Sequence, residues 1–514
     1  MPQLALFVAA LDQTIVATSI PTISAQFHSA SGYFWIGGAY LLANAAAAPL
    51  WAKCSDIWGR KPTLLGAVVL FAVGSTIAAL SVSMRMLIAA RALQGTAGGG
   101  LMQLVTITIS DLFSMRRRTL YLGFLEVVWA VAGGAGPLIG GAFTQLATWR
   151  WCFWINLPVC GVTFVLLLVF LDVHNPRTRF REGLAAIDWL GTVLILSVTL
   201  MLLLGLDFGG TVFPWSSAKV ICLLVFGTLA IGFFVYSERR LAKYPLMPLA
   251  IFKDVSNVAL FVVGFSQGMA FIAAEYYLPL YLQSVKHASP LRSGVLILPI
   301  TVSEAVVGIV CGLVMHQTGH YKAIICIGLA LTTLGTGLYI SFSSTTPIAR
   351  VVGFEIVGGC GCGMLFEAPI IALQNAVTQA DTATATAAYG FLRNIATSMS
   401  IVIGGVIFKN GMDMRAAALQ ASGLNSSLVT AFSGGEAAAS VELVGSIKDP
   451  LQQRAAEDAF AWSLRNMWIF FTGIAAVGLL AGVFVKQKNL SREHVETKTG
   501  IEQMSRRVEA SSRI

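Results

Sequence analysis

The stretch Trp-Ala-Lys-Cys-Ser-Asp-Ile-Trp-Gly-Arg-Lys-Pro at residues 51–62 lies between two long apolar runs. It is short and basic, and it contains Gly59, a residue type that permits a tight turn. Each flanking run is long enough to cross a bilayer, which takes about 20 mostly apolar residues. The pattern therefore predicts a loop at a membrane surface, with Asp56, Gly59, Arg60 and Lys61 as its candidate functional residues.

The composition of the whole chain also indicates a membrane protein. The chain has 514 residues, of which 56% are hydrophobic and 11% are charged, and its mean hydropathy is +0.76. A soluble chain carries about 25% charged residues. The net charge of +9 comes largely from short loops, which favours membrane topology over a nucleic-acid partner. No Walker A motif and no CxxC array occurs, so neither ATP hydrolysis nor a metal site is expected.

Apolar stretches of membrane-spanning length predict an all-α integral membrane protein with fourteen transmembrane helices. The predicted helices are 3–23, 33–53, 63–83, 87–110, 119–145, 150–172, 187–207, 217–237, 256–283, 291–314, 321–343, 348–373, 386–408 and 465–485. The predicted regions are an N-terminal six-helix bundle (1–172), two inserted central helices with flanking loops (173–254), a C-terminal six-helix bundle (255–485) with a long extracellular loop (410–464), and a cytoplasmic tail (486–514).

Basic residues concentrate in alternate loops and in the tail, which predicts the orientation. These loops carry Lys53, Arg60 and Lys61; Arg116, Arg117 and Arg118; Arg177, Arg179 and Arg181; Arg239, Arg240, Lys243 and Lys253; and Lys322. The positive-inside rule then places both termini in the cytoplasm, which requires an even number of spans. No signal peptide is expected, because Met1 lies almost at the start of the first span.

Several motifs resemble those of one transporter family. Residues 56–61 resemble the loop between spans two and three of the major facilitator superfamily, although Ala52 replaces the usual opening Gly. Gly136, Pro137, Gly140 and Gly141 resemble its antiporter signature; the other interpretation is close helix packing through small residues. The stretches 11–16, 91–95 and 149–158 resemble signatures of the fourteen-span drug:proton antiporters. The resemblance covers about 5–485 and implies the major facilitator fold.

Ionisable residues inside predicted spans are candidates for proton coupling or transport. Each costs roughly 2.5–3.5 kcal/mol to insert, so each needs a partner or a function. A carboxyl group in an apolar cavity also holds a proton more readily than one in water, as a proton carrier must. The candidates are Asp12, Arg91, Glu126, Glu304, Glu355, Glu367 and Arg393. The resemblance implies a coupling role for Arg91, with a structural ion pair as the alternative, and Glu367 is predicted to pair with Arg393.

The resemblance implies a proton-coupled secondary active transporter that exports small amphipathic drugs, toxins or secondary metabolites. It would act as a multi-pass monomer without cofactor or metal, in the plasma membrane or alternatively the vacuolar membrane, with protons, a small molecule and lipid as its only partners. A vacuolar importer of basic amino acids remains an alternative, since Glu355 and Glu367 suit a cationic cargo. The sequence favours neither an enzyme nor a non-transporting receptor, because it has no nucleophile motif or clustered metal ligands.

The orientation predicts which of two glycosylation sequons is used. Asn425-Ser426-Ser427 lies in the predicted extracellular loop, and Asn489-Leu490-Ser491 lies in the predicted cytoplasmic tail. In a eukaryotic host, Asn425→Gln should therefore remove the only glycan, as seen by a gel-mobility shift after glycosidase treatment. The matched change Asn489→Gln should leave mobility unchanged, and a glycan on Asn489 would overturn the orientation.

Overall fold

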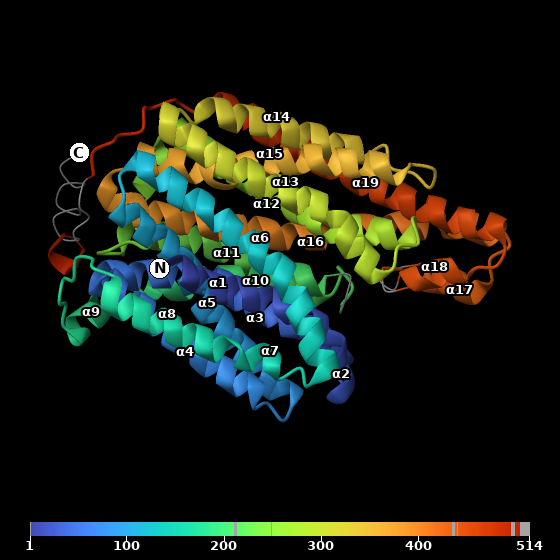
Figure 1. Ribbon diagram of the computed structural model, residues 1–514, viewed down its shortest axis with the longest axis horizontal. Helices are drawn as coiled ribbons and strands as arrows, with labels where there is room; N and C mark the ends of the chain where they lie inside the picture. The colour runs from blue at the N-terminus through green and yellow to red at the C-terminus, as the bar shows by residue number, and fades with distance from the viewer. Residues whose placement is uncertain are drawn as a thin grey trace.

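The computed structural model describes residues 2–209, 213–247, 249–433, 437–438, 440–494 and 499–503. Within these ranges the secondary structure is helical, with one isolated β-bridge between Gly209 and Phe213. Most of the helices run side by side along the long axis, with the C-terminal segment at one end and α17 and α18 at the other (Figure 1). The all-α fold predicted from the sequence is confirmed.

The helices fall into three consecutive groups along the chain. The N-terminal group consists of α1 (Pro2–Ile15), α2 (Ile20–Gln26), α3 (Ala30–Trp58), α4 (Arg60–Ala79), α5 (Met84–Leu112), α6 (Met115–Leu146), α7 (Trp151–Trp154) and α8 (Asn156–Phe170). The central group consists of α9 (Phe180–Ala186), α10 (Trp189–Phe208) and α11 (Ala218–Arg240). The C-terminal group consists of α12 (Val255–Ser284), α13 (Pro290–Thr318), α14 (Lys322–Tyr339), α15 (Ile348–Ala376), α16 (Thr382–Ala421), α17 (Ser426–Ala431), α18 (Val441–Ser446) and α19 (Pro450–Val483).

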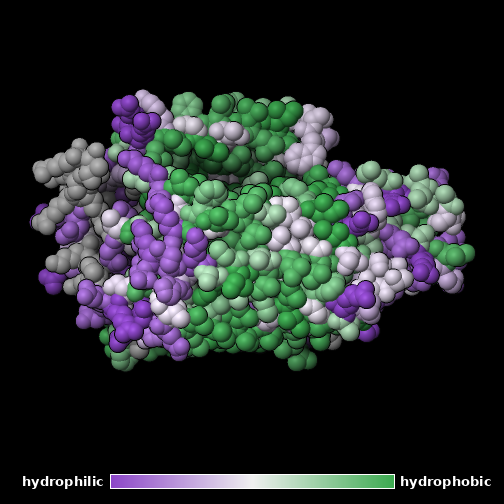
Figure 2. Space-filling model, turned by 90° about the horizontal axis from the view of Figure 1, so that it is seen from above, coloured by the Kyte–Doolittle hydropathy of each residue, from purple (hydrophilic) through white to green (hydrophobic). Residues whose placement is uncertain are grey.

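Among the described residues, eleven helices are long and apolar enough to cross a membrane. The other predicted spans are also helical. Range 33–53 lies within α3 and range 87–110 lies within α5, whereas range 3–23 is divided between α1, a 3-10 turn at Ala17–Ser19, and α2. The count of fourteen therefore stays a prediction. Figure 2 shows a broad hydrophobic belt with hydrophilic side chains gathered toward the two ends, as expected for a membrane-spanning bundle.

The segment 410–464, predicted as a long extracellular loop, is largely helical in the structure. Helix α16 continues to Ala421, α19 begins at Pro450, and α17 and α18 lie between them. These segments bury Leu424, Phe432 and Val444 against Phe460 in one apolar cluster. Burial against neighbouring helices thus stabilises helical turns that are not apolar enough all round to resemble a span.

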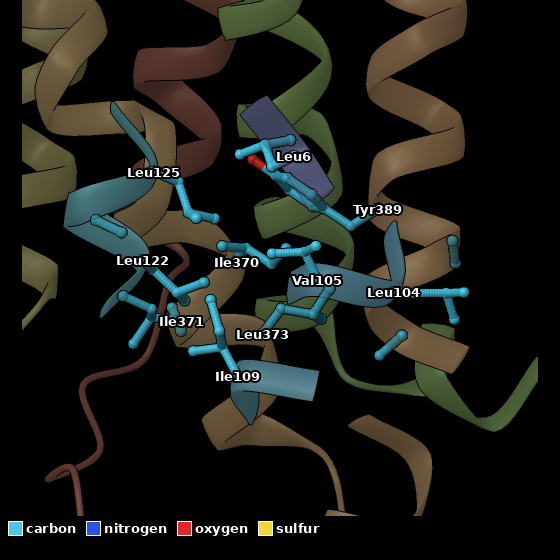
Figure 3. Close-up of a cluster of buried hydrophobic side chains, with 14 of the residues drawn as sticks. Leu6, Leu104, Val105, Ile109, Leu122, Leu125, Ile370, Ile371, Leu373 and Tyr389 are labelled. Atoms are coloured by element: carbon cyan, nitrogen blue, oxygen red, sulfur yellow. The ribbon is translucent and has the colours of Figure 1, made fainter. Parts of the chain in front are cut away.

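An apolar seam joins the N-terminal and C-terminal groups of helices. Figure 3 shows side chains from both groups pointing toward one another: Leu6, Leu104, Val105, Ile109, Leu122 and Leu125 from the first, and Ile370, Ile371, Leu373 and Tyr389 from the second. The seam lies toward the end of the bundle that carries the 51–62 loop and the C-terminal segment. We call this the basic end, and the end that carries α17 and α18 the opposite end.

The glycines of the 133–141 string divide by the face of α6 on which they lie. Gly136 and Gly140 lie against α1: a Cβ on Gly136 would overlap the Thr14 side chain, and one on Gly140 would overlap the backbone carbonyl of Ile15. The Thr14 hydroxyl also donates to the carbonyl of Ala132 at 2.8 Å. Gly141 has open space around its Cβ position. The small residues at 136 and 140 thus allow close backbone approach.

This asymmetry predicts a difference between two alanine substitutions. Gly140→Ala should destabilise the protein by about 1–3 kcal/mol, because its methyl group has no room against α1. The matched control Gly141→Ala should be neutral or stabilising by up to about 1 kcal/mol, since alanine is the better helix former. The apparent unfolding temperature of the purified protein measures both. Equal losses in the two variants would show that contact with α1 is not what requires glycine.

Candidate functional site

A buried polar cluster in the N-terminal group contains Asp12 and Arg91, which the sequence analysis named separately. Nη1 of Arg91, on α5, donates to Oδ2 of Asp12, on α1, at 2.5 Å. Oδ1 of Asp12 accepts from Nε2 of Gln94 at 3.1 Å and from Nδ2 of Asn156 at 2.7 Å. The side chain of Asp12 is 0% exposed and that of Arg91 is 2% exposed. Both carboxylate oxygens therefore have donors, and the charge has a partner.

The remaining contacts hold the Arg91 guanidinium in place. Its Nε donates to the carbonyl of Ile36 at 3.0 Å, and its Cζ lies 4.5 Å from the centroid of the Tyr40 ring. Ser75 accepts from Gln94 at 2.8 Å and extends the network to α4. Sequence reasoning did not predict that Gln94, Asn156 and Ser75 would surround Asp12. A search for buried amides inside apolar spans, by the rule applied to charged residues, could have found the first two.

A second set of ionisable residues lies where the two groups of helices meet. Glu126, on α6, interacts electrostatically with Glu304 on α13, with Glu367 on α15 and with Arg393 on α16. A Cβ on Gly308 would lie 2.9 Å from Cγ of Glu126. Gly308 is one helical turn from Glu304, so both residues share a face of α13. The sequence analysis named both glutamates, and the fold places Glu126 against the helix that carries Glu304.

Arg393 does not form the ion pair with Glu367 that the sequence analysis predicted. Its guanidinium Cζ lies 3.9 Å from the ring centroid of Phe366, a cation–π arrangement. Glu367 is only 9% exposed and interacts with Arg393 electrostatically without an ion-pair contact between them in the described part of the chain. The prediction considered the depth of the two residues in the bilayer. The sequence does not indicate that the Phe366 ring covers the face of the Arg393 guanidinium.

Glu275, on α12, belongs to this set, although sequence reasoning missed it. It interacts electrostatically with Glu304 and with Glu355. Glu355 is 0% exposed, and neither of its carboxylate oxygens has a hydrogen-bond partner. The hydroxyl of Tyr339, also buried and unpartnered, interacts with both Glu355 and Glu275. Glu275 lies in the predicted span 256–283, so the rule that flagged the other intramembrane carboxylates would also have found it.

The charges of this second set are not balanced. Glu126, Glu275, Glu304, Glu355 and Glu367 are five carboxyl groups, and in the described structure Arg393 interacts with three of them, Glu126, Glu304 and Glu367. One oxygen each of Glu126 and Glu304 also lacks a hydrogen-bond partner. A buried carboxylate without a partner is costly, so such a set can take up protons or cationic groups. The Asp12–Arg91 cluster, in contrast, is satisfied internally.

The stretch 51–62, which was predicted as a loop, is helical on both sides of Gly59, where α3 ends and α4 begins. It forms a compact ion-pair cluster at the basic end. Arg60 donates through Nη1 to Oδ1 of Asp56 at 2.7 Å and through Nε to Oδ2 of Asp111 at 2.6 Å. Its side chain is 2% exposed. Asp111, in the last turn of α5, is a partner that the sequence analysis missed. Lys61 lies beside the cluster and is partly exposed.

Gly59 is needed where the chain turns between α3 and α4. Its φ of 93° lies in the region that favours glycine. A Cβ there would also lie 2.9 Å from Cδ of Pro176. The turn directs Arg60 back toward Asp56 and across to Asp111, so Gly59 positions the ion pairs rather than taking part in them.

Hydrogen bonds join the two groups of helices at the basic end. Arg118 donates to Oε1 of Gln374 at 3.3 Å and to Oε1 of Gln379 at 2.9 Å. Ser110 also donates to Oε1 of Gln374, at 3.1 Å, and Thr119 donates to the carbonyl of Gly312 at 2.9 Å. Together with the apolar seam of Figure 3, these bonds connect the two groups of helices at the basic end.

Comparison with known proteins identifies similar chains. Residues 4–401 match the family model described as Major Facilitator Superfamily. The chain is 45% identical over 499 residues to the efflux pump dotC of Dothistroma septosporum, covering 97% of this chain and 85% of that protein. It is 46% identical over 497 residues to the MFS-type transporter ppz2 of Metarhizium majus, covering 97% and 86%. These relatives are named as a pump and a transporter rather than as enzymes.

Solved structures share the arrangement of helices. The human organic anion transporter MFSD10 superposes with a TM-score of 0.60 at 15% identity, covering 94% of this chain and 98% of that chain. The proton:xylose symporter XylE also has a TM-score of 0.60, at 14% identity, covering 95% and 96%. At these identities the similarity concerns the fold alone.

The Arg60 cluster predicts a graded loss of stability. Asp56→Asn or Asp111→Asn alone leaves Arg60 one carboxylate, whereas the double variant leaves a buried guanidinium without one. Removing the partners of a buried charge costs about 3–5 kcal/mol, so the double variant should unfold well before either single variant. Glu182→Gln is the matched control, because its pair with Arg179 is exposed and 3.8 Å long and should contribute about 1 kcal/mol or less. Comparable stability of the double variant and the control would contradict the assignment.

Proposed function

Because the chain belongs to the Major Facilitator Superfamily, we propose that it is a proton-coupled secondary active exporter of small amphipathic compounds. One observation supports this proposal above the others: the carboxyl group of Glu126 meets that of Glu304 where the two groups of helices join. Two negatively charged carboxylates at this junction repel each other and oppose the approach of the two halves. Protonation of one carboxylate removes that repulsion. Binding of a proton at this junction can therefore be coupled to the movement of one half against the other.

The polarity of the bundle assigns its two ends to the two sides of the membrane. The basic end carries the loops rich in arginine and lysine, so the positive-inside rule assigns it and both termini to the cytoplasm. With that end closed, the described conformation would be the one that faces outward. Relatives named as efflux pumps fit the same direction.

The transport cycle would be alternating access between two states. One half rocks against the other around a site near the middle of the membrane. In the state described here the Arg60 cluster, the bonds of Arg118 and the apolar seam close the basic end. Opening that end must break these contacts, so the 51–62 loop would act as a latch for the outward-facing state.

The proposed roles of the acidic residues differ between the halves. Asp12 is paired with Arg91 and accepts from Gln94 and Asn156, so we assign it mainly to holding the N-terminal half together. Glu126 and Glu304 are placed between the halves and have unpartnered oxygens, so they are the first candidates for proton coupling. Glu355, Glu367 and Arg393 would support them and influence which charges the cavity accepts.

The excess of carboxyl groups also keeps a second candidate function open. An importer of basic amino acids into the vacuole would have use for a set of five carboxyl groups and one guanidinium. The names of the relatives favour an efflux pump, so export at the plasma membrane is the first proposal. Accumulation of arginine or lysine in vacuolar vesicles, measured beside dye efflux from whole cells, separates the two functions.

Amide substitutions in vesicles test the proton coupling. Glu126→Gln and Glu304→Gln mimic the protonated state and should abolish uphill accumulation driven by a pH gradient, while substrate exchange without a gradient persists.

Asp12→Asn should mainly reduce stability, because it leaves Arg91 buried without its charge partner. Asp56→Asn should insert normally but transport poorly, and the surface change Glu182→Gln should match the parent.

The results of these transport measurements distinguish the proposed roles of the residues. If Glu126→Gln and Glu304→Gln accumulate substrate as the parent does, the proton site lies elsewhere, with Glu355 and Glu367 tested next. Normal transport by Asp56→Asn would remove the latch. A parent that ignores the pH gradient would contradict proton coupling altogether.

A further inference from the structure

A cavity of about 790 Å³ opens at the basic end, apart from the residues proposed for transport. Its charged and titratable lining residues are Arg116, Arg117, His316, Arg492 and His494. No carboxylate lines it in the described structure. Three arginines thus line one space, and no acidic side chain lines it among the described residues.

The wall formed by Arg116 is rigidly built. Its guanidinium donates to the carbonyls of Gln317 and Thr318, each at 3.2 Å, and to the carbonyl of Leu490 at 3.3 Å. His316 bonds through Nδ1 to the backbone carbonyl of Arg116 at 2.9 Å. All three acceptors of the guanidinium are neutral, so these bonds orient its positive charge without cancelling it.

The C-terminal segment completes the cavity because it is anchored on both halves of the protein. Leu490 is 3% exposed and belongs to the main apolar core, and its N–H donates to the carbonyl of Gly319 at 3.2 Å. The carbonyl of Ser491 accepts from the N–H of Arg116, also at 3.2 Å. This anchoring brings Arg492 and His494 to the cavity. Its walls therefore come from the start of α6, the end of α13 and the C-terminal segment.

We propose that this cavity binds a phosphate-bearing anion, either the headgroup of an anionic lipid or a soluble phosphate. Guanidinium groups match the geometry of phosphate oxygens and bind them through paired, charge-assisted hydrogen bonds. Basic residues that only set the orientation of a membrane protein lie scattered over water-exposed loops, as Arg177, Arg179 and Arg181 do. In contrast, Arg116, Arg117 and Arg492 line one cavity. Since both halves and the C-terminal segment contribute walls, the bound anion ties them together and stabilises the closed basic end.

Thermal unfolding of the full-length protein in nanodiscs tests this site. The parent is compared in phosphatidylcholine alone, in phosphatidylcholine with phosphatidic acid, and in phosphatidylcholine with added inorganic phosphate. A ligand that binds the folded state raises the unfolding temperature. We expect at least one of the two probes to do so, with an apparent affinity at least tenfold weaker in the double variant Arg117→Gln/Arg492→Gln. These two side chains are exposed, so their loss should not prevent folding.

Two further variants make the result specific. Arg117→Lys/Arg492→Lys keeps the charges without the paired donors and should bind the probe more tightly than the Gln variant but more weakly than the parent. Arg239→Gln/Arg240→Gln removes two exposed arginines at the same end outside the cavity and should behave as the parent. A response to phosphatidic acid alone identifies a lipid headgroup, and a response to inorganic phosphate identifies a soluble ligand. If neither probe stabilises the parent, or if the Arg239/Arg240 variant loses the effect equally, the proposal is overturned.

Discussion

The hydrocarbon interior of a bilayer does not solvate ions, and this constraint governs every charged side chain inside the bundle. The N-terminal half meets it internally, because Arg91 neutralises Asp12 while Gln94 and Asn156 supply further hydrogen bonds. At the junction and in the C-terminal half, five carboxyl groups form one electrostatically connected set, and Arg393 interacts with three of them in the described structure. The N-terminal half therefore contains a completed ion pair. The set that Glu126 of that half forms with the carboxyl groups of the C-terminal half is incomplete, and a proton or a cation can complete it.

The same constraint explains why the fold could be predicted from the sequence. Long apolar runs become helices because the backbone must satisfy its own hydrogen bonds in lipid. Isolated ionisable residues within those runs mark sites, and Asp12, Arg91, Glu126 and Glu304 were found in this way. Glu275 obeys the same rule and was overlooked. The partners could not be predicted, since no local pattern indicates that Asp111 meets Arg60 or that Phe366 covers the guanidinium of Arg393.

Hydropathy also did not predict the helices that are covered by protein rather than by lipid. The segment 410–464 looked like a loop because its apolar residues are separated by polar ones. In the structure those apolar residues face Phe460 and the rest of one cluster, while the polar ones face outward. The contacts of the C-terminal segment, predicted as a cytoplasmic tail, could not be predicted for a similar reason. Nothing in its charge-rich sequence indicates that Leu490 is a core residue or that the carbonyl of Ser491 accepts a hydrogen bond from α6.

Helix α16 contains 40 residues, from Thr382 to Ala421. At 1.5 Å per residue, such a helix is about 60 Å long, roughly twice the thickness of the hydrocarbon core. Arg393 lies in the part that approaches the carboxyl groups, and the far part continues to the base of α17 (Figure 1). The far part is covered by protein, because Met412 and Leu419 are buried in one apolar cluster with residues of α12 and α19. A rigid tilt of this helix about its buried part would move its far end, beside α17, by a larger distance, so a probe attached there would report on the carboxyl groups of the interior.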